Sequence, residues 1–230
     1  MEFTRGRHPR RGETRLPATV ATAVAIALYA VLPEKLIPGP RLAVPVLEVL
    51  LLVAVVVANP VRSGPRTRWS RRTSIALTVL VLATNLYALT VLLHALVATK
   101  AGGPPLLLAA LQIWVTNVIV FGLLFWELDR GGPVARQQTR RDRLQAADFR
   151  FTQDEDDDTV EEVRRGSSAV SGWIPGYVDH LYVSLTNSSA FSPTDTMPLT
   201  PRAKVLMGFE ATTALITSVV VIAKGVGSLQ

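Results

Sequence analysis

The feature that most constrains this chain is a series of five long apolar runs separated by charged joints. The runs cover residues 16–32, 42–58, 74–98, 106–128 and 203–226. Each approaches the ~20 apolar residues that a helix needs to cross a bilayer. Only helices and closed barrels satisfy their own backbone hydrogen bonds in lipid. The sequence therefore predicts an all-α integral membrane protein with five transmembrane helices.

Composition narrows the classes of partner. The chain has 230 residues, of which 49% are hydrophobic, a formal net charge of +6 and no cysteine. Its arginines flank the apolar runs, whereas a nucleic-acid surface gathers basic residues on one face. Without cysteine this chain forms no disulfide and no thiolate metal site. We expect the lipid bilayer as the main partner, no nucleic acid, no cofactor and no bound metal.

The joints between the runs predict the orientation. Arginine is dense in residues 1–15, in the 59–73 joint and after the fourth run, but sparse in the 33–41 and 99–105 joints. Since cytoplasmic joints carry the excess of basic residues, we expect a multi-pass protein of the cell inner (plasma) membrane with a cytoplasmic N-terminus. The first run also fits a signal peptide, but no small-x-small cleavage site precedes Pro33, which favours an uncleaved span.

Four parts follow from this pattern. They are a basic cytoplasmic tail (1–15), a four-helix transmembrane region (16–128), a polar and mobile cytoplasmic loop (129–176), and a re-entrant segment with the last transmembrane helix (177–226). The loop is too polar to bury a core. Its acidic run 153–158 fails the EF-hand pattern, because Thr159 stands where that loop needs glycine. At the end of the fourth run, Phe121, Phe125 and Trp126 predict an aromatic belt at the membrane interface.

Residues 177–191 are too few to cross a bilayer, yet they are apolar and aromatic enough to leave water. A half-crossing helix is possible where protein or a water-filled cavity covers its free backbone groups. The sequence therefore predicts a re-entrant, pore-helix-like segment before the last span, with residues 192–195 as the turn at its tip or mouth.

Residues 182–210 resemble the pore loop and inner helix of two-transmembrane-type potassium channels. Aligned without gaps, Tyr182 and Ser184 match the pore helix, Asp195 matches the filter aspartate, and Glu210 matches the inner-helix acid. The turn between them is matched by Pro198, Thr200, Pro201, Ala203 and Lys204. The resemblance implies a homo-oligomer, a tetramer if channel-like, that encloses a path for an inorganic cation.

The filter differs from that family. Ser192, Pro193 and Thr194 stand where the family has Gly-Tyr-Gly, whose carbonyls replace the hydration shell of the ion. Proline fixes φ near −65°, whereas glycine alone reaches positive φ freely. We therefore expect a wider, hydroxyl-lined pore without potassium-type selectivity. The pore and ion-pathway candidates are Thr186, Ser188, Ser189, Ser192, Pro193, Thr194, Asp195, Glu210, Thr213 and Thr217.

Two points stay open in the sequence: the side of the membrane from which the re-entrant segment enters, and the family that the whole chain resembles. Four spans from a cytoplasmic N-terminus place the re-entrant segment on the cytoplasmic side, an arrangement similar to glutamate-receptor pores; alternatively the whole protein is inverted. The chain as a whole also resembles an uncharacterised family of bacterial integral membrane proteins, through residues 126–133 and 186–195. That second resemblance implies no activity.

Polar residues inside the apolar runs are the remaining candidates, because such groups usually face a bundle interior or water. They are Glu48, Asn85, His94, Gln112 and Asn117. Glu210, Thr213 and Thr217 share one helix face, which lines a pore or hydrogen-bonds a neighbouring helix. His94 either exchanges protons with Glu48 or Glu210, or makes a structural hydrogen bond.

Catalytic motifs are missing from the sequence. It has no G-x-S-x-G, H-E-x-x-H, P-loop or G-x-G-x-x-G, so we expect no enzyme and no catalytic residues. Two hypotheses remain: a channel-like protein that passes cations, and a non-conducting structural or partner-recruiting membrane protein with a degenerate pore loop.

Overall fold

Among the residues that the structure describes, three helices are long and apolar enough to cross a membrane. The computed structural model describes residues 15–37, 42–58, 68–98, 104–155, 160–189 and 196–227. Within these ranges the candidate spans run Arg71–Leu96, Pro105–Gly131 and Pro201–Ile222. The predicted helical class is confirmed, and the three spans indicate a membrane protein. The first two predicted spans form shorter apolar helices, α1 (Leu16–Ala30) and α2 (Ala43–Ala58).

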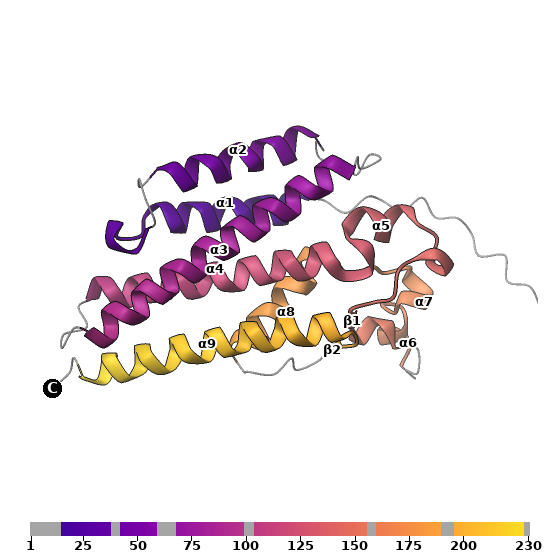
Figure 1. Ribbon diagram of the computed structural model, residues 1–230. Helices are drawn as coiled ribbons and strands as arrows, with labels where there is room; N and C mark the ends of the chain where they lie inside the picture. Colours follow the sequence, from indigo (N-terminus) through magenta and orange to yellow (C-terminus); the bar gives the residue numbers. More distant parts are fainter. Residues whose placement is uncertain are drawn as a thin grey trace, which may run out of the picture.

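The long helices lie side by side and alternate in direction. They are α1, α2, α3 (Arg68–Ala98), α4 (Pro104–Leu128) and α9 (Pro201–Gly227). Figure 1 places the starts of α1, α3 and α9 and the ends of α2 and α4 at one end of the bundle. We call this the α5 end, because α5 (Pro133–Gln138) lies there.

Local sequence signals set the limits of the helices. Two prolines stand in the first turn of α4, where their missing N–H groups cost nothing. At the start of α9, the Thr200 hydroxyl accepts the Ala203 backbone N–H at 3.3 Å, as an N-cap residue does. After α4 the chain reverses through Arg130, Gly131 and Gly132, which all have positive φ (51°, 82° and 93°). Glycine adopts this conformation without strain, which explains why the helix ends here.

Short elements fill the α5 end. Besides α5 they are η2 (Asp129–Gly131), η3 (Arg141–Arg143), β1 (Phe149–Arg150), η4 (Thr152–Asp154), α6 (Glu161–Arg164) and α7 (Ser168–Ser171). One further short element, η1 (Glu34–Leu36), follows α1 at the opposite end of the bundle. β1 pairs antiparallel with β2 (Met197–Pro198), with Phe149 opposite Pro198 and Arg150 opposite Met197. This pairing joins residues 129–176 to the start of α9.

The segment predicted as a polar loop contributes to the core. Phe149 and Phe151 are buried with Phe121 and Phe125 of α4. The ring centroids of Phe125 and Phe149 are 5.1 Å apart. Phe121 and Phe125 therefore point inward, and Trp126 is also buried, against Tyr177. The aromatic belt predicted at the membrane interface is wrong for all three. The reason is that Phe149, Phe209 and Tyr177 supply aromatic partners that the periodicity of α4 alone does not reveal.

Helix α8 (Tyr177–Ser189) has half the length of its neighbours and packs between α4 and α9. Its 13 residues rise about 20 Å, less than the ~30 Å of a bilayer core. Gly122 of α4 permits the close approach, because a Cβ there would lie 3.0 Å from the Cα of Leu181. α8 thus begins at the α5 end and runs along α4 toward the middle of the bundle (Figure 1).

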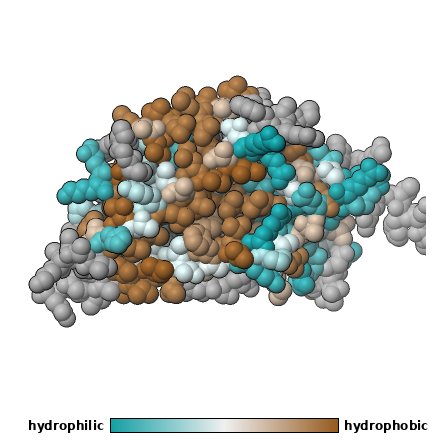
Figure 2. All heavy atoms as spheres, viewed as in Figure 1, coloured by the Kyte–Doolittle hydropathy of each residue, from teal (hydrophilic) through white to brown (hydrophobic). Residues whose placement is uncertain are grey.

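The surface separates by polarity along the same axis. Figure 2 shows hydrophobic residues over most of the middle of the visible face, and hydrophilic residues toward its ends, most of them at the α5 end. Large apolar side chains such as Leu50, Val57 and Val205 are more than half exposed. An apolar middle between polar ends suits a bundle surrounded by lipid.

Candidate functional site

The first polar cluster surrounds Glu210, whose side chain is fully buried. Ser184 and Ser188 of α8 hydrogen-bond its Oε1, Ser188 at 3.1 Å. The amide of Asn187 donates to Oε2 at 2.7 Å and to the Met207 carbonyl at 2.9 Å. Ser184 Oγ also lies 2.7 Å from the Val118 carbonyl of α4. We call Ser184, Asn187, Ser188 and Glu210 the Glu210 node.

Helix geometry brings these groups together deep in the bundle. Positions 184, 187 and 188 share one face of α8, which turns toward α9. Val118, which Ser184 contacts, stands 11 residues before Asp129 at the end of α4, or about 16 Å along the helix. Since the whole of α4 rises about 37 Å, the node lies near its middle.

The threonines of α9 continue this polar face. Asn117 of α4 donates to Thr213 Oγ1 at 3.4 Å, and Thr213 in turn donates to the Glu210 carbonyl at 2.8 Å. Thr217 is buried and donates to the Thr213 carbonyl at 2.7 Å. Within one chain, the predicted pore face of α9 therefore packs against α4 and α8.

The other pore candidates lie elsewhere. Thr186 is half-buried and bonds the Tyr182 carbonyl at 2.9 Å. Ser189 is exposed and bonds the Leu185 carbonyl at 2.7 Å. The remaining candidates, Ser192, Pro193, Thr194 and Asp195, lie outside the described residues.

A second buried acid, Glu48 of α2, lies apart from the node. It accepts a hydrogen bond from Thr84 of α3 at 3.3 Å. Asn85, the residue after Thr84, is also buried. Gln112 is half-buried, and His94 is exposed on α3. The structure thus brings Asn117 to the Glu210 face but places His94 with neither buried acid.

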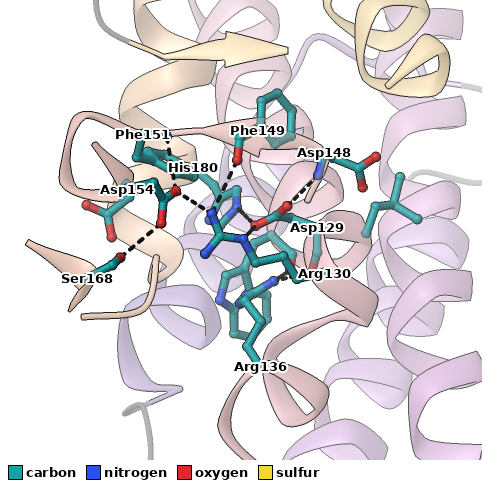
Figure 3. Close-up of polar contacts among 12 residues, drawn as sticks. Asp129, Arg130, Arg136, Asp148, Phe149, Phe151, Asp154, Ser168 and His180 are labelled. Carbon is teal, nitrogen blue, oxygen red and sulfur yellow. Dashed lines mark hydrogen bonds and ion pairs between the residues drawn. The ribbon is translucent and has the colours of Figure 1, made fainter. Parts of the chain in front are cut away.

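The second polar cluster, which we call the end cap, closes the α5 end of α4 and α8 (Figure 3). Asp129 is fully buried, and its Oδ1 accepts the Asp148 backbone N–H at 2.9 Å. His180 of α8 is also fully buried; its Nε2 lies 3.4 Å from Asp129 Oδ2 and its Nδ1 lies 2.7 Å from the Gly176 carbonyl. Both ring nitrogens are therefore engaged, and His180 fixes the start of α8 to the end of α4.

Arginines complete the end cap. Arg136 of α5 is fully buried and donates to the Trp126 and Asp129 carbonyls at 2.8 and 2.6 Å. A cation at the last carbonyls of a helix compensates their partial negative charge. Arg130 bonds Asp154 and the Phe149 carbonyl, the latter at 3.3 Å. Figure 3 shows Arg130 between the Asp129 and Asp154 carboxylates.

Asp148 ties the end cap to α9. Arg202 donates to Asp148 Oδ1 through Nε at 2.7 Å and to Oδ2 through Nη2. The Thr200 hydroxyl also bonds Asp148, and Leu199 N–H donates to its carbonyl at 2.7 Å. The start of α9 and the end of α4 are thereby held in one hydrogen-bonded unit.

Ion pairs on the surface contrast with those of the end cap. On α6, Glu161 is half-exposed and accepts hydrogen bonds from Arg164 at 2.9 Å and Arg165 at 3.2 Å. These guanidinium donors lower the pKa of Glu161 below its ordinary value. Pairs of this kind contribute little to stability, because water screens them.

The site candidates predicted from the sequence included Glu210 and Ser188 of the Glu210 node, but not Ser184 or Asn187. The i, i+3, i+4 spacing of Ser184, Asn187 and Ser188 on a short helix was the available signal. For the end cap, the signal was the alternation Phe149-Arg150-Phe151, which is typical of a strand in an otherwise polar segment.

The chemistry of both clusters is that of hydrogen bonding and ion pairing. Across the described ranges, no group of three or more His, Asp or Glu side chains is placed to hold a metal ion. Comparisons of this chain with protein families, curated proteins and solved structures gave no match.

Proposed function

We propose that this chain is a multi-pass membrane protein in which α8 is a re-entrant half-helix, and that a homo-oligomer of it passes cations. One observation carries the proposal: α8 begins beside Asp129 at the α5 end, reaches the middle of α4 at Val118, and is followed by α9, which starts again at the α5 end. A helix that enters half-way and returns to the same side is the arrangement of a pore helix.

Electrostatics favours a cation over an anion. The C-terminal end of a helix carries about half a negative charge, so the end of α8 near mid-membrane attracts cations. The hydroxyls of Thr186 and Ser189 lie in this last turn and are not fully buried. With α1 and α2 as tilted or shortened spans, all five predicted transmembrane helices fit this arrangement.

The arginine pattern supports a cytoplasmic α5 end. Its described arginines include Arg71, Arg140, Arg141 and Arg143, whereas the far end has Lys35 and, in the last turns of α9, Lys224. The positive-inside rule then places the N-terminus and the opening of the re-entrant segment in the cytoplasm.

Cysteine labelling tests the re-entrant segment. The native chain has no cysteine, and Val178, Tyr182, Leu185 and Ser189 have exposed side chains at successive depths along α8. Single cysteines there should react with a membrane-impermeant maleimide in a graded way, from one side only. A cysteine at Val163 of α6, which is 54% exposed, is the matched control and should react freely. Equal reaction at all four α8 positions would refute a re-entrant helix.

Flux measurements test conduction. Purified protein in liposomes, under sodium and potassium gradients, should pass cations. Asp195→Asn should reduce the flux, because Asp195 matches the filter aspartate of the resembled channels. Asp142→Asn is the matched control, because Asp142 is exposed and pairs only with Arg140 in the described contacts. Absence of flux under every gradient and voltage would eliminate the cation path.

A second candidate is a non-conducting membrane protein whose re-entrant segment is structural. The specific observation in its favour is that Glu210, the acid expected along the pore, is fully buried and hydrogen-bonded within one chain. Graded cysteine labelling without flux would support this candidate, with the α5 end as the surface that recruits a partner.

A further inference from the structure

The hydrogen bonds of Ser184 require one more hydrogen than that residue has. Ser184 Oγ lies within bonding distance of the Val118 carbonyl, at 2.7 Å, and of Glu210 Oε1. A serine hydroxyl carries one hydrogen, and a backbone carbonyl only accepts. If that hydrogen goes to Val118, the contact with Glu210 needs a hydrogen on the carboxyl group.

The hydrogen bonds of Asn187 and Ser188 agree with a hydrogen on the Glu210 carboxyl group. The Asn187 amide has two hydrogens, which bond the Met207 carbonyl and Glu210 Oε2. Ser188 gives its single hydrogen to Oε1 at 3.1 Å. A protonated Glu210 then donates from Oε1 to Ser184 and accepts from Ser188 and Asn187. The node has five contacts, and Ser184, Asn187 and Ser188 supply four hydrogens, so only a protonated Glu210 provides one hydrogen for each contact.

The surroundings also favour a neutral acid. All three side chains that bond Glu210 are uncharged, and a charged carboxylate near the bilayer centre is costly. Titratable groups on the neighbouring helices are engaged elsewhere: Asp179 accepts from Gly176 N–H at 2.7 Å, and His180 contacts Asp129. On α4, Glu127 accepts from Ser74 at 2.6 Å, and on α9, Arg202 bonds Asp148. Lys204 of α9 is exposed, as are Tyr182 of α8 and Tyr87 and His94 of α3.

We propose that the Glu210 node is a proton-binding site, with the proton on Glu210 Oε1 and shared with Ser184. Release of this proton leaves Ser184 between two acceptors with one hydrogen, which weakens the contact that Ser184 of α8 makes with Val118 of α4 or with Glu210 of α9. The position of the half-helix is therefore coupled to proton binding. The proposal rests on the membrane placement in the proposed function, but not on conduction.

Infrared spectroscopy of the full-length protein in liposomes tests the proposal, because a neutral carboxylic acid and a carboxylate absorb in different regions. At neutral pH we expect a carboxylic-acid C=O band that is lost in Glu210→Gln. Glu48→Gln is the matched control, because Glu48 is also a fully buried glutamate with an uncharged partner, and this variant should retain the part of the band that Glu210→Gln loses. In Ser184→Ala the band should move to higher frequency, since the acid loses its acceptor.

Identical carboxylic-acid bands in the wild type and Glu210→Gln, or a band that does not move in Ser184→Ala, would overturn the proposal. Glutamine keeps the size of the side chain and can donate to Ser184, and the Ser184→Ala shift is read with Glu210 still present. The infrared result is independent of flux. A Glu210 band without flux would refute conduction and support the proton-binding site. Flux without that band would refute the proton-binding site alone.

Discussion

The contact between α4 and α8 at Gly122 predicts a graded loss of stability on substitution. A Cβ at Gly122 would lie 3.0 Å from the Cα and 3.3 Å from the Cδ1 of Leu181, tighter than ordinary contact. Because the nearest atom belongs to the α8 backbone, the whole helix must move by a few tenths of an ångström. Two hydrogen bonds of α8 to the end and middle of α4 oppose that movement: His180 to Asp129 and Ser184 to the Val118 carbonyl.

The magnitude follows from opposing terms. Overpacking costs about 1–3 kcal/mol, while alanine gains roughly 0.8–1.0 kcal/mol over glycine in helix propensity. We therefore expect Gly122→Ala to lower the free energy of unfolding by about 1 kcal/mol. Gly122→Val adds two further methyl groups and lowers it by about 3 kcal/mol. Gly208→Ala, on the open face of α9 with nothing within 4 Å of its Cβ, is the matched control and should lose no stability.

Equilibrium unfolding in mixed micelles of mild detergent and dodecyl sulfate, followed by circular dichroism, measures these differences. The order of midpoints should be Gly208→Ala, Gly122→Ala, Gly122→Val, from highest to lowest. A Gly122→Val protein as stable as the wild type would refute the close packing of α8 on α4, and with it the depth assigned to the Glu210 node.

Three further predictions concern the α5 end. Asp129→Asn removes the fully buried charge that pairs the end of α4 with His180 of α8, and should lower the free energy of unfolding by about 3 kcal/mol in the same assay. Glu161→Gln, at an exposed position, should leave the free energy of unfolding unchanged. Equal effects of the two substitutions would contradict the end cap. Phe149→Ala should cost about 3 kcal/mol and speed tryptic cleavage of residues 140–176, whereas Val163→Ala, 54% exposed, should do neither. Gly132→Ala should lower the thermal midpoint, because φ is 93° and its Cβ would lie 2.9 Å from a backbone oxygen; an unchanged midpoint would contradict this backbone geometry.

Much of the helical content follows from the sequence alone. Helices α3, α4 and α9 cover the three longest apolar runs. A run of about 20 apolar residues favours a helix, because a helix pairs its own backbone N–H and C=O groups where water is absent. The half-length of α8 was also predictable, since residues 177–191 are too few to cross. Prolines in the first turn and glycines after the last turn marked several helix limits.

Tertiary structure decided which polar groups meet. Glu210 was recognisable as an intramembrane acid, but its binding by Ser184 and Asn187 depends on how α8 crosses α9, which helix periodicity does not specify. Asp129, Asp148 and His180 are far apart in the sequence and meet only because Gly131 and Gly132 reverse the chain after α4. Composition describes residues 129–176 as polar, yet Phe149 and Phe151 are buried, because two aromatic residues at alternate positions suffice to anchor a strand once α4 and α8 provide a surface. Pattern along the chain therefore determines which segments form long apolar helices, and long-range packing determines which buried polar groups find partners.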